Sequence, residues 1–322
     1  MKPIFKILSL LLLAGITFTS CRNEDGTEQE EETPTATELK LYAIDTAKVL
    51  KMNADGSGET TILNKKVNLN SYISELSIKP SGTKFAFDEH QMSGGVFQKK
   101  VIVANIDGTG EKTVFSTGDL NADINYVKYC SDGKVMFLTM DYSTNTKTLH
   151  TINEDGTGDV TKDFPYNFYD ISDDREYMVN TVGTSVGNRK VVILDIDGDG
   201  GYPGGPNSFN VDVPTAEEIG KPKFTSDNKY VITPYKAGNE IKAIVIEIAT
   251  RASKSFTMVS GLSSSGWLSY NLHLSPNKPF GVLTLTGSGY SKSKSYVIDV
   301  EKEKISATFD NKNGNIFDVY PN

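Results

Sequence analysis

The chain is poor in the residues that build soft metal sites and disulfide frameworks. Its 322 residues include three histidines (His90, His150 and His273), two cysteines (Cys21 and Cys130) and one tryptophan. Zinc sites take several Cys and His ligands at short spacings, which these scattered residues do not supply. The two cysteines also lie in very different contexts, so we expect no disulfide, no bound metal and no cofactor.

The chain also lacks an excess of positive charge. Lys and Arg number 33 against 41 Asp and Glu, a formal charge of −8, and no basic stripe occurs along the sequence. Proteins that bind DNA or RNA carry clustered Lys and Arg that neutralise phosphates. Nucleic acid is therefore not an expected partner.

The first 20 residues have the pattern of an export signal. Lys2 and Lys6 precede an apolar run from Ile7 to Phe18, which is shorter than the roughly 20 residues of a membrane-spanning helix. The run ends in FTSC at 18–21, which resembles a lipobox with the small residue Ser20 before Cys21. We predict that 1–20 is a lipoprotein signal peptide and that Cys21 is lipidated. An ordinary cleaved signal and an uncleaved anchor are the alternatives.

Residues 21–38 are polar, acidic and free of aromatic side chains. Such a segment buries too little apolar surface to fold, so it is predicted to be a disordered tether. Its acidic start resembles the signal that sends some lipoproteins to the outer face of the outer membrane, although a merely solvated linker has the same composition. The expected location is the outer membrane, anchored by lipid on the periplasmic side or at the cell surface.

Residues 39–322 contain a repeat built from two kinds of tight turn. The first kind follows β-branched runs and reads NADGSG at 53–58, NIDGTG at 105–110, NEDGTG at 153–158 and DIDGDG at 195–200. The second kind alternates with it and reads KPSG at 79–82, SDGK at 131–134, SDDR at 172–175, SDNK at 226–229 and SPNK at 275–278. Asp-Gly between apolar runs is a strong hairpin signal. One unit of strand, turn, strand, longer loop, strand, turn and strand is a four-stranded propeller blade of about 40 to 50 residues.

The two ends of this region complement each other. Residues 316–322 (IFDVYPN) align without gaps on 271–277 (NLHLSPN), so they form an inner strand without successors. Residues 39–63 hold the successors but no inner strand. The sequence therefore predicts an all-β, six-bladed propeller of four-stranded antiparallel blades, closed by mixing N- and C-terminal strands in one blade, because this pairing removes an open sheet edge.

The paired SPNK and N-x-DGTG turns resemble the WD40-like repeats of TolB-type propellers, and the resemblance covers about 39–322. It implies a six-bladed propeller but carries no partner contacts, since the shared residues are turn residues. Other TolB-like propellers act as lyases on oligogalacturonides with metal-bound histidines at the channel. The three scattered histidines of this chain do not match that pattern.

Two further motifs have both a functional and a structural interpretation. GTSVG at 183–187 matches the nucleophile elbow, but it joins two expected strands of one blade, so a glycine-rich hairpin loop is the better explanation. Asp195, Asp197 and Asp199 fit the first half of a calcium loop. Pro203 and Pro206 occupy the later ligand positions, which leaves Asx-turn chemistry as the favoured interpretation of these three aspartates. Cys130 is expected to be a small buried apolar residue.

Both kinds of tight turn fall on one face of the ring, because successive strands alternate in direction, and the longer loops gather on the other. The loops are expected at 67–74, 89–99, 141–147, 164–169, 182–189, 235–240, 260–270 and 287–294. Aromatic residues are frequent there, and variable loops on a rigid scaffold are where binding concentrates. The candidate ligand-binding residues are Trp267, Tyr270, Tyr166, Phe168, Tyr142 and Tyr290. We expect a non-catalytic cell-envelope module that binds a protein or glycan. The alternative is a hydrolase or lyase acting on an extracellular polysaccharide or peptide.

Overall fold

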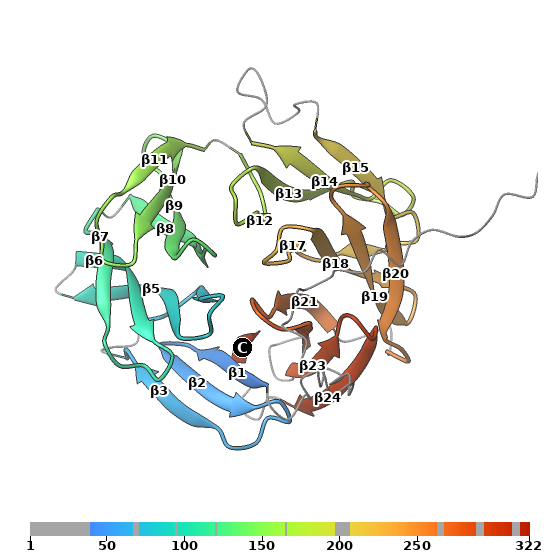
Figure 1. The fold of residues 1–322 in the computed structure, drawn as a ribbon, viewed down its shortest axis with the longest axis horizontal. Helices are drawn as coiled ribbons and strands as arrows, with labels where there is room; N and C mark the ends of the chain where they lie inside the picture. The colour runs from blue at the N-terminus through green and yellow to red at the C-terminus, as the bar shows by residue number, and fades with distance from the viewer. Residues whose placement is uncertain are drawn as a thin grey trace, which may run out of the picture. The chain divides into compact units, whose positions relative to one another are not determined.

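The protein is described by a computed structural model that covers residues 39–66, 71–93, 96–119, 121–164, 166–196, 207–262, 267–287, 293–310 and 316–322. All regular structure in these residues is β-strand, arranged in six antiparallel sheets around a ring (Figure 1). No helix in the described residues could cross a membrane. The expected six-bladed propeller is confirmed.

Each sheet is one blade, and its first strand lies nearest the centre of the ring. Blade one contains β25 (Ile316–Pro321), β1 (Lys40–Asp45), β2 (Lys48–Asn53) and β3 (Thr60–Asn64). Blade two contains β4 (Leu76–Ile78), β5 (Lys84–Ser93), β6 (Val96–Asn105) and β7 (Lys112–Thr117). Blade three contains β8 (Ala122–Tyr129), β9 (Lys134–Asp141), β10 (Thr146–Asn153) and β11 (Val160–Asp163).

The remaining three blades follow in chain order. Blade four contains β12 (Asp170–Ile171), β13 (Tyr177–Val182), β14 (Lys190–Asp195) and β15 (Phe209–Asp212). Blade five contains β16 (Glu218–Ile219), β17 (Lys223–Phe224), β18 (Tyr230–Ala237), β19 (Glu240–Glu247) and β20 (Ser253–Val259). Blade six contains β21 (Trp267–Leu274), β22 (Phe280–Gly287), β23 (Ser293–Asp299) and β24 (Lys304–Asp310).

The Asp-Gly turns close the outer hairpins of the first three blades as the sequence predicts. In blade two, the Asn105 side-chain amide donates to Thr109 Oγ1 at 3.1 Å, and the Thr109 amide donates to Asp107 Oδ1 at 2.9 Å. Gly108 follows with a φ of 85°, a conformation that glycine adopts without a Cβ clash. Blades one and three repeat the arrangement around Asp55 and Asp155. The fourth copy, at 195–200, lies largely outside the described residues.

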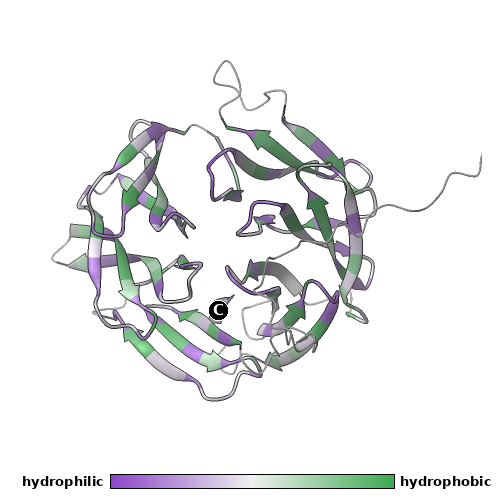
Figure 2. Cartoon of the chain, viewed as in Figure 1, coloured by the Kyte–Doolittle hydropathy of each residue, from purple (hydrophilic) through white to green (hydrophobic). Residues whose placement is uncertain are grey.

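The hydrophobic core is divided into six clusters that lie between neighbouring blades rather than within them. One cluster joins Ile44 of blade one to Phe87 of blade two, and another joins Leu41 of blade one to Val282 of blade six. The other four join blades two to six in order. Hydrophobic residues follow the strands while polar residues dominate the turns, as Figure 2 shows. Because every blade buries both faces against neighbours, the ring is continuous.

Blade one combines strands from both ends of the propeller. β25 pairs antiparallel with β1, with Tyr320 opposite Tyr42 and Pro321 opposite Leu41. The Asn322 amide donates to the Lys40 carbonyl at 2.9 Å. This pairing is the one predicted from the alignment of 316–322 on 271–277, and it covers an edge of β1 that would otherwise be open.

Two segments that the sequence analysis assigned to loops are strands. The expected loop 89–99 is mostly hairpin, because β5 and β6 stay in register from Lys84↔Asn105 to Ser93↔Val96. Cross-strand pairs such as Glu89 and Lys100, whose charged atoms lie 3.7 Å apart, continue the ladder outward. Trp267 and Tyr270 likewise belong to the inner strand β21, where they pair with Gly287 and Leu285. The expectation that they lie in an inter-blade loop was wrong.

We call the two sides of the ring the turn face and the loop face. The turn face carries the repeated tight turns, such as 53–58, 79–82 and 131–134. The loop face carries the opposite connections, such as 142–145, 164–169 and 183–189. The assignment follows from the alternating direction of the antiparallel strands.

Candidate functional site

A pocket of about 290 Å³ opens on the loop face beside the inner strands of blades three to five. Its wall holds the aromatic residues Tyr126, Tyr166, Phe168 and Tyr169 and the lysines Lys147, Lys221 and Lys223. Asn125, Asn167 and Glu75 add polar groups. Ligand sites in proteins are concave, largely aromatic or apolar, and carry a few polar groups that orient the ligand. We call this the loop-face pocket.

Irregular inner strands create the pocket. In β8 the pairing with β9 shifts between Asn125 and Val127, and Tyr126 takes a φ of 64°. A bulge of this kind bends a strand and redirects a side chain, and bulges are frequent next to functional sites. The inner strand of blade five is interrupted at 220–222, where Pro222 has no amide hydrogen for the ladder. Lys221 and Lys223 lie at this interruption.

The aromatic wall is packed rigidly against a buried ring. Phe164 is fully buried and contacts Tyr166 and Phe168 edge to face, with ring centroids 5.4 and 5.2 Å apart. Phe168 contacts Tyr126 in the same way at 5.0 Å. Edge-to-face pairs place the positive ring edge against the negative ring face, which fixes the rings relative to one another. The wall therefore keeps its shape without a ligand.

The lysines of the pocket differ in what they contact. Lys147 donates to Asn167 Oδ1 at 2.5 Å and to the Tyr166 carbonyl at 3.4 Å, so it holds the 164–169 connection in place. For the side-chain ammonium groups of Lys221 and Lys223, the described part of the chain offers no hydrogen-bond or ion-pair partner. Lys221 is exposed and Lys223 is half-buried. Two cationic groups thus remain available in the lining of the pocket.

Next to the pocket, polar residues occupy equivalent positions of the inner strands. The turn hydrogen bonds Gly133 N to Cys130 O, Arg175 N to Ser172 O and Asn228 N to Thr225 O set the blades in register. The residue two positions before each of these carbonyl groups is Lys128 in blade three, Asp170 in blade four and Lys223 in blade five. The same position holds Ser77 in blade two and His273 in blade six, and all five residues line a narrow channel cavity of about 110 Å³. Asp318 is the equivalent in blade one by alignment, and its side chain lies outside the described residues.

The channel carboxylates are fully engaged with neighbouring blades. Asp170 accepts hydrogen bonds from the Tyr126 hydroxyl and the Phe224 amide, both at 2.8 Å. Asp173 accepts from the Ser131 amide at 2.8 Å. The Lys128 ammonium lies 3.6 Å from Asp170 and 3.2 Å from Asp173. Buried charges are stable when paired in this way, so these groups join blades three, four and five.

The same contacts determine how these groups titrate. Burial opposes the charge of Lys128, but Asp170 and Asp173 outweigh burial and raise its pKa. Burial, and then the charge of Asp170, raise the pKa of Tyr126 well above its usual range. Lys128 therefore stays protonated and Tyr126 stays neutral, which makes both poor bases or nucleophiles at neutral pH. This arrangement favours structural cohesion and binding over proton transfer.

The predicted ligand-binding residues divide into three groups. Tyr166 and Phe168 meet in the loop-face pocket. Tyr142 lies apart from them in the β9–β10 connection, 55% exposed, and its hydroxyl donates to Asp123 Oδ2 at 3.1 Å. Trp267 and Tyr270 belong to β21, but their side chains are outside the described residues, as is all of Tyr290. The predicted grouping of Trp267 and Tyr270 with Tyr166 and Phe168 remains a prediction.

Sequence reasoning missed the lysines, Tyr126 and Asp170. An alignment of the second turns would have found the inner-strand position, because polar residues recur there beside apolar neighbours. It would not have found the Tyr126 bulge or the fit of Tyr126 to Asp170, which depend on how blades three and four pack.

A buried histidine, His90 of β5, also lies toward the loop face of blade two. His90 Nε2 lies 2.9 Å from Asp88 Oδ2, and the Tyr72 ring stacks on the imidazole with centroids 4.3 Å apart. Asp88 also accepts from the amides of Ser74 and Glu75, both at 2.8 Å. These bonds fix the start of blade two against its own hairpin. No group of three or more His, Cys, Asp or Glu in the described residues could hold a metal ion.

The other motifs take structural roles where they are described. Residues 183–187 connect β13 and β14, which pair antiparallel, so this GxSxG is a hairpin connection as expected. Cys130 is fully buried in a core cluster, and burial raises the pKa of its thiol to about 12, which agrees with a packing role. Asp195 accepts from the Asn207 amide at 3.1 Å. Asp197 and Asp199 lie outside the described residues, as does Cys21.

A larger groove of about 650 Å³ lies on the turn face between blades five and six. Tyr230, Ile232, Leu274 and Phe280 line it, and Lys254 and Glu301 stand at its edge. Tyr230 is exposed, and among the exposed large apolar side chains of the described residues it alone lines this groove. Six others, Tyr72, Met92, Tyr142, Tyr169, Val182 and Val186, belong to loop-face connections or to the strand ends beside them, whereas Val160 and Ile305 lie at the starts of β11 and β24, next to turn-face turns.

Several solved structures share the fold of this chain. No protein-family model and no curated protein matches the chain. TolB from Acinetobacter baumannii is similar with a TM-score of 0.59 and 13% identity, over 90% of this chain and 68% of that one. A chain of the nidogen/laminin complex is similar with a TM-score of 0.53 and 12% identity, over 88% of this chain and 96% of that one. The β-propeller domain of the Trilobed protease from Pyrococcus furiosus, which has an open velcro topology, gives 0.51 at 12% identity, over 88% and 95%.

Identities this low concern the fold and not the ligand. Six antiparallel blades in a ring, repeated tight turns on one face and the likeness to TolB agree with one another. This chain therefore has the fold of a six-bladed β-propeller that is similar to the propeller of TolB.

Proposed function

We propose that the protein is a lipid-anchored cell-envelope module whose propeller binds a ligand, without catalysis, through its loop face. The loop-face pocket is the observation that carries this proposal. It combines a rigid aromatic wall with two cations that have no partner in the described residues. Preorganised aromatic residues in a concave site are typical of binding hot spots.

The surroundings of the pocket support binding over catalysis. The channel acids Asp170 and Asp173 are committed to Lys128 and to backbone amides. A general acid or base must be able to reach the substrate with its proton-exchanging atoms, and the oxygens of these carboxylates already contact groups of the protein. The alternative of a hydrolase or lyase on an extracellular polymer gains no specific support from this geometry.

The proposed envelope location rests on the sequence. Lys2, Lys6, the short apolar run and Ser20 before Cys21 support export and lipidation, and 21–38 supports a tether. A tethered propeller would present one face away from the membrane. The concentration of exposed apolar side chains on the loop face makes that face the proposed docking side.

Two tyrosines of equal exposure test the docking face. Tyr169 on the loop-face pocket and Tyr230 on the turn-face groove are each 37% exposed. The full chain carrying Cys21→Ser would be screened on glycan arrays and in envelope pull-downs. Its ligand would then be titrated against Tyr169→Ala and Tyr230→Ala. Truncating an aromatic anchor costs about 2 kcal/mol or more, so Tyr169→Ala should weaken binding more than tenfold.

The Tyr230→Ala control shows which face of the ring binds the ligand. Tyr230→Ala should bind like the parent, and both variants should melt within a few degrees of it, because both side chains are exposed. Trp267→Ala is a third variant, expected to weaken the same ligand if β21 contributes to the site. A ligand lost with Tyr230→Ala and retained with Tyr169→Ala would place the docking side on the turn face and overturn the proposal.

A further inference from the structure

The charge of the loop-face pocket is opposite to that of the whole chain. The chain has a formal charge of −8, yet the pocket carries Lys147, Lys221 and Lys223 against the single acid Glu75. The side-chain ammonium groups of Lys221 and Lys223 have no hydrogen-bond or ion-pair partner in the described residues. Clusters of one sign in a concave site raise the local concentration of ligands of the other sign. The pocket is therefore suited to an anion.

The shape and chemistry of the wall restrict what carries that anion. A volume of about 290 Å³ lies at the low end for ligand pockets, which suits one or two small rings. Four aromatic residues line it, and the faces of such rings are negative, so they attract the weakly positive C–H groups of a saturated ring. Asn125 and Asn167 bring side-chain amides, which donate to and accept from hydroxyl groups.

The backbone around the pocket argues against an extended peptide. Peptides in grooves are commonly held by free backbone groups of a strand edge. Here the Tyr169 amide donates to the Val179 carbonyl, the Gly220 amide to the Pro234 carbonyl, and the Phe224 amide to Asp170, each at 2.8 Å. The wall therefore offers ring faces, amides and ammonium groups but few backbone donors.

We infer that the loop-face pocket binds a carboxylated sugar unit of an acidic glycan. In this arrangement the aromatic wall stacks on the sugar ring, Lys221 and Lys223 bind the carboxylate, and the asparagine amides bind hydroxyl groups. The inference rests on the proposed function and names the class of ligand for that same site. No bond is made or broken, since the site acts by binding.

Three probes of similar size test the ligand class. The full chain carrying Cys21→Ser would be titrated calorimetrically with a hexasaccharide of glucuronic acid, with the same hexasaccharide after reduction of its carboxyl groups to alcohols, and with hexaglutamate. The acidic hexasaccharide should bind at least tenfold more tightly than its reduced form, because charge-assisted hydrogen bonds to the lysines are lost on reduction. Its affinity should fall as salt screens these exposed charges.

A matched pair of double variants tests the residues. Lys221→Gln with Lys223→Gln should weaken the acidic hexasaccharide at least tenfold. Lys229→Gln with Lys254→Gln removes the same charge from the same blade on the turn face, where these lysines pair with Asp227 and Glu303, and should leave the affinity unchanged. Melting temperatures of both double variants would show that each is folded.

Four results would overturn the inference. Equal binding of the acidic and reduced hexasaccharides would remove the role of the carboxylate, and tight binding of hexaglutamate alone would assign the site to an acidic peptide. Equal loss in both double variants would show attraction by net charge only. The absence of binding by every probe would exclude this class of ligand. In each of these cases a screened ligand that depends on Tyr169 but not on Tyr230 would still support the proposed function.

Discussion

Single residues decide how the blades of this propeller fit together. Gly108 is the clearest case, because a Cβ at this position would lie 2.1 Å from the carbonyl oxygen of Ile62 in the neighbouring blade. Gly133 has a similar φ, 81° against 85°, but a Cβ there would meet only the flexible end of Lys79 at 3.8 Å. Gly133 therefore shows the cost of the left-handed backbone conformation alone, whereas Gly108 adds the cost of a clash with the neighbouring blade.

Alanine at these two glycines should give different losses of stability. Gly133→Ala should cost about 1–2 kcal/mol of unfolding free energy, the penalty of a left-handed conformation for a residue with a Cβ. Gly108→Ala carries the same penalty and also displaces β3, so it should cost at least about 1 kcal/mol more. Denaturant unfolding of both variants measures the difference. Equal losses would show that the contact with Ile62 relaxes freely.

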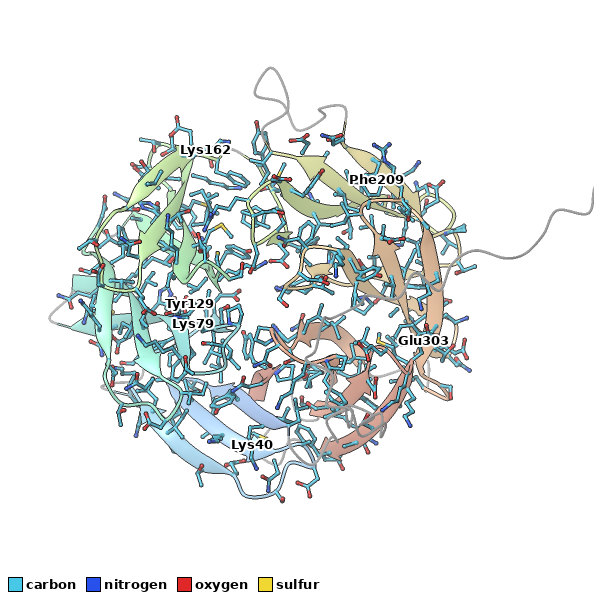
Figure 3. The ribbon with its side chains drawn as sticks, in the orientation of Figure 1. Lys40, Lys79, Tyr129, Lys162, Phe209 and Glu303 are labelled. Atoms are coloured by element: carbon cyan, nitrogen blue, oxygen red, sulfur yellow. The ribbon has the colours of Figure 1, made fainter. Side chains whose placement is uncertain are left out.

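A second residue-scale feature links blades two and three through a carboxylate. Glu154 accepts from the Tyr129 hydroxyl and lies 3.2 Å from both Lys79 and Lys84. The Lys79 ammonium also lies over the Tyr129 ring, 5.3 Å from its centroid, and Figure 3 shows these two residues next to each other. The hydrogen bond from Tyr129 lowers the pKa of Glu154 to about 2, against the opposing effect of burial and with help from the two lysines. Ionised Glu154 is therefore more stable in the folded protein than in the unfolded chain.

This lowered pKa predicts that Glu154→Gln loses stability to an extent that depends on pH. Because the folded pKa is lowered, the stabilisation is complete above the usual carboxyl pKa of about 4.3 and disappears as pH falls toward 2. At pH 7 the variant should lose about 1 kcal/mol, since the side chain is one-third exposed and solvent screens the pair. The difference from the parent should shrink between pH 5 and pH 2. Glu59→Gln, at an exposed site, is the control, and a loss independent of pH would refute the assignment.

Elements differ in how regular they can be without harm to the ring. The two middle strands of a blade keep long registers, such as the ten-residue pairing of β5 with β6. The inner strands of blades three to five are bulged, shortened or interrupted. The inner strands of these blades border the channel, so their irregularities disturb few core contacts. In blades three to five these irregular segments form the wall of the loop-face pocket. The candidate site thus lies where regular strand pairing is least needed.

The shared blade gives a prediction at the level of one strand. β25 supplies the edge partner of β1, and Tyr320 is buried in the core between blades one and two, with its ring 4.2 Å from that of His273. Deleting 315–322 removes this strand and should cost several kcal/mol, comparable with the stability of a whole domain. The deletion should aggregate or melt far below the full chain. Tyr320→Ala is a milder variant, expected to lose about 3 kcal/mol. A truncated chain that melted like the parent would show that β25 does not support the ring.

At the scale of the whole molecule, six inter-blade cores make the propeller one cooperative unit. Each blade contributes apolar side chains to two clusters, and blade one contacts both blade two and blade six. Loss of any interface therefore exposes surface on two blades at once. We expect a single unfolding transition, which differs from a linear repeat array that can open from its ends.

The cellular placement is also a property of the whole chain. If Cys21 is the lipid attachment site, mass spectrometry of the mature protein should find an N-terminal Cys21 that carries diacylglycerol, and Cys21→Ser should release the protein from membranes. Stable anchoring by acyl chains follows from the burial of many CH₂ groups. An unmodified Cys21, or a mature N-terminus elsewhere, would contradict lipidation and leave the propeller unaffected.

The sequence by itself determined the architecture, because tight turns and apolar alternation are local signals that repeat in every blade. It also predicted the partner of β25 and placed Tyr166 and Phe168 on the loop face. Tertiary structure decided the rest. It extended β5 and β6 beyond the expected strands, placed Trp267 and Tyr270 in an inner strand, and brought Lys221, Lys223 and Tyr126 to the same pocket. Tyr126 lies in blade three and the two lysines lie in blade five, and only the closure of the ring sets the distances between these blades.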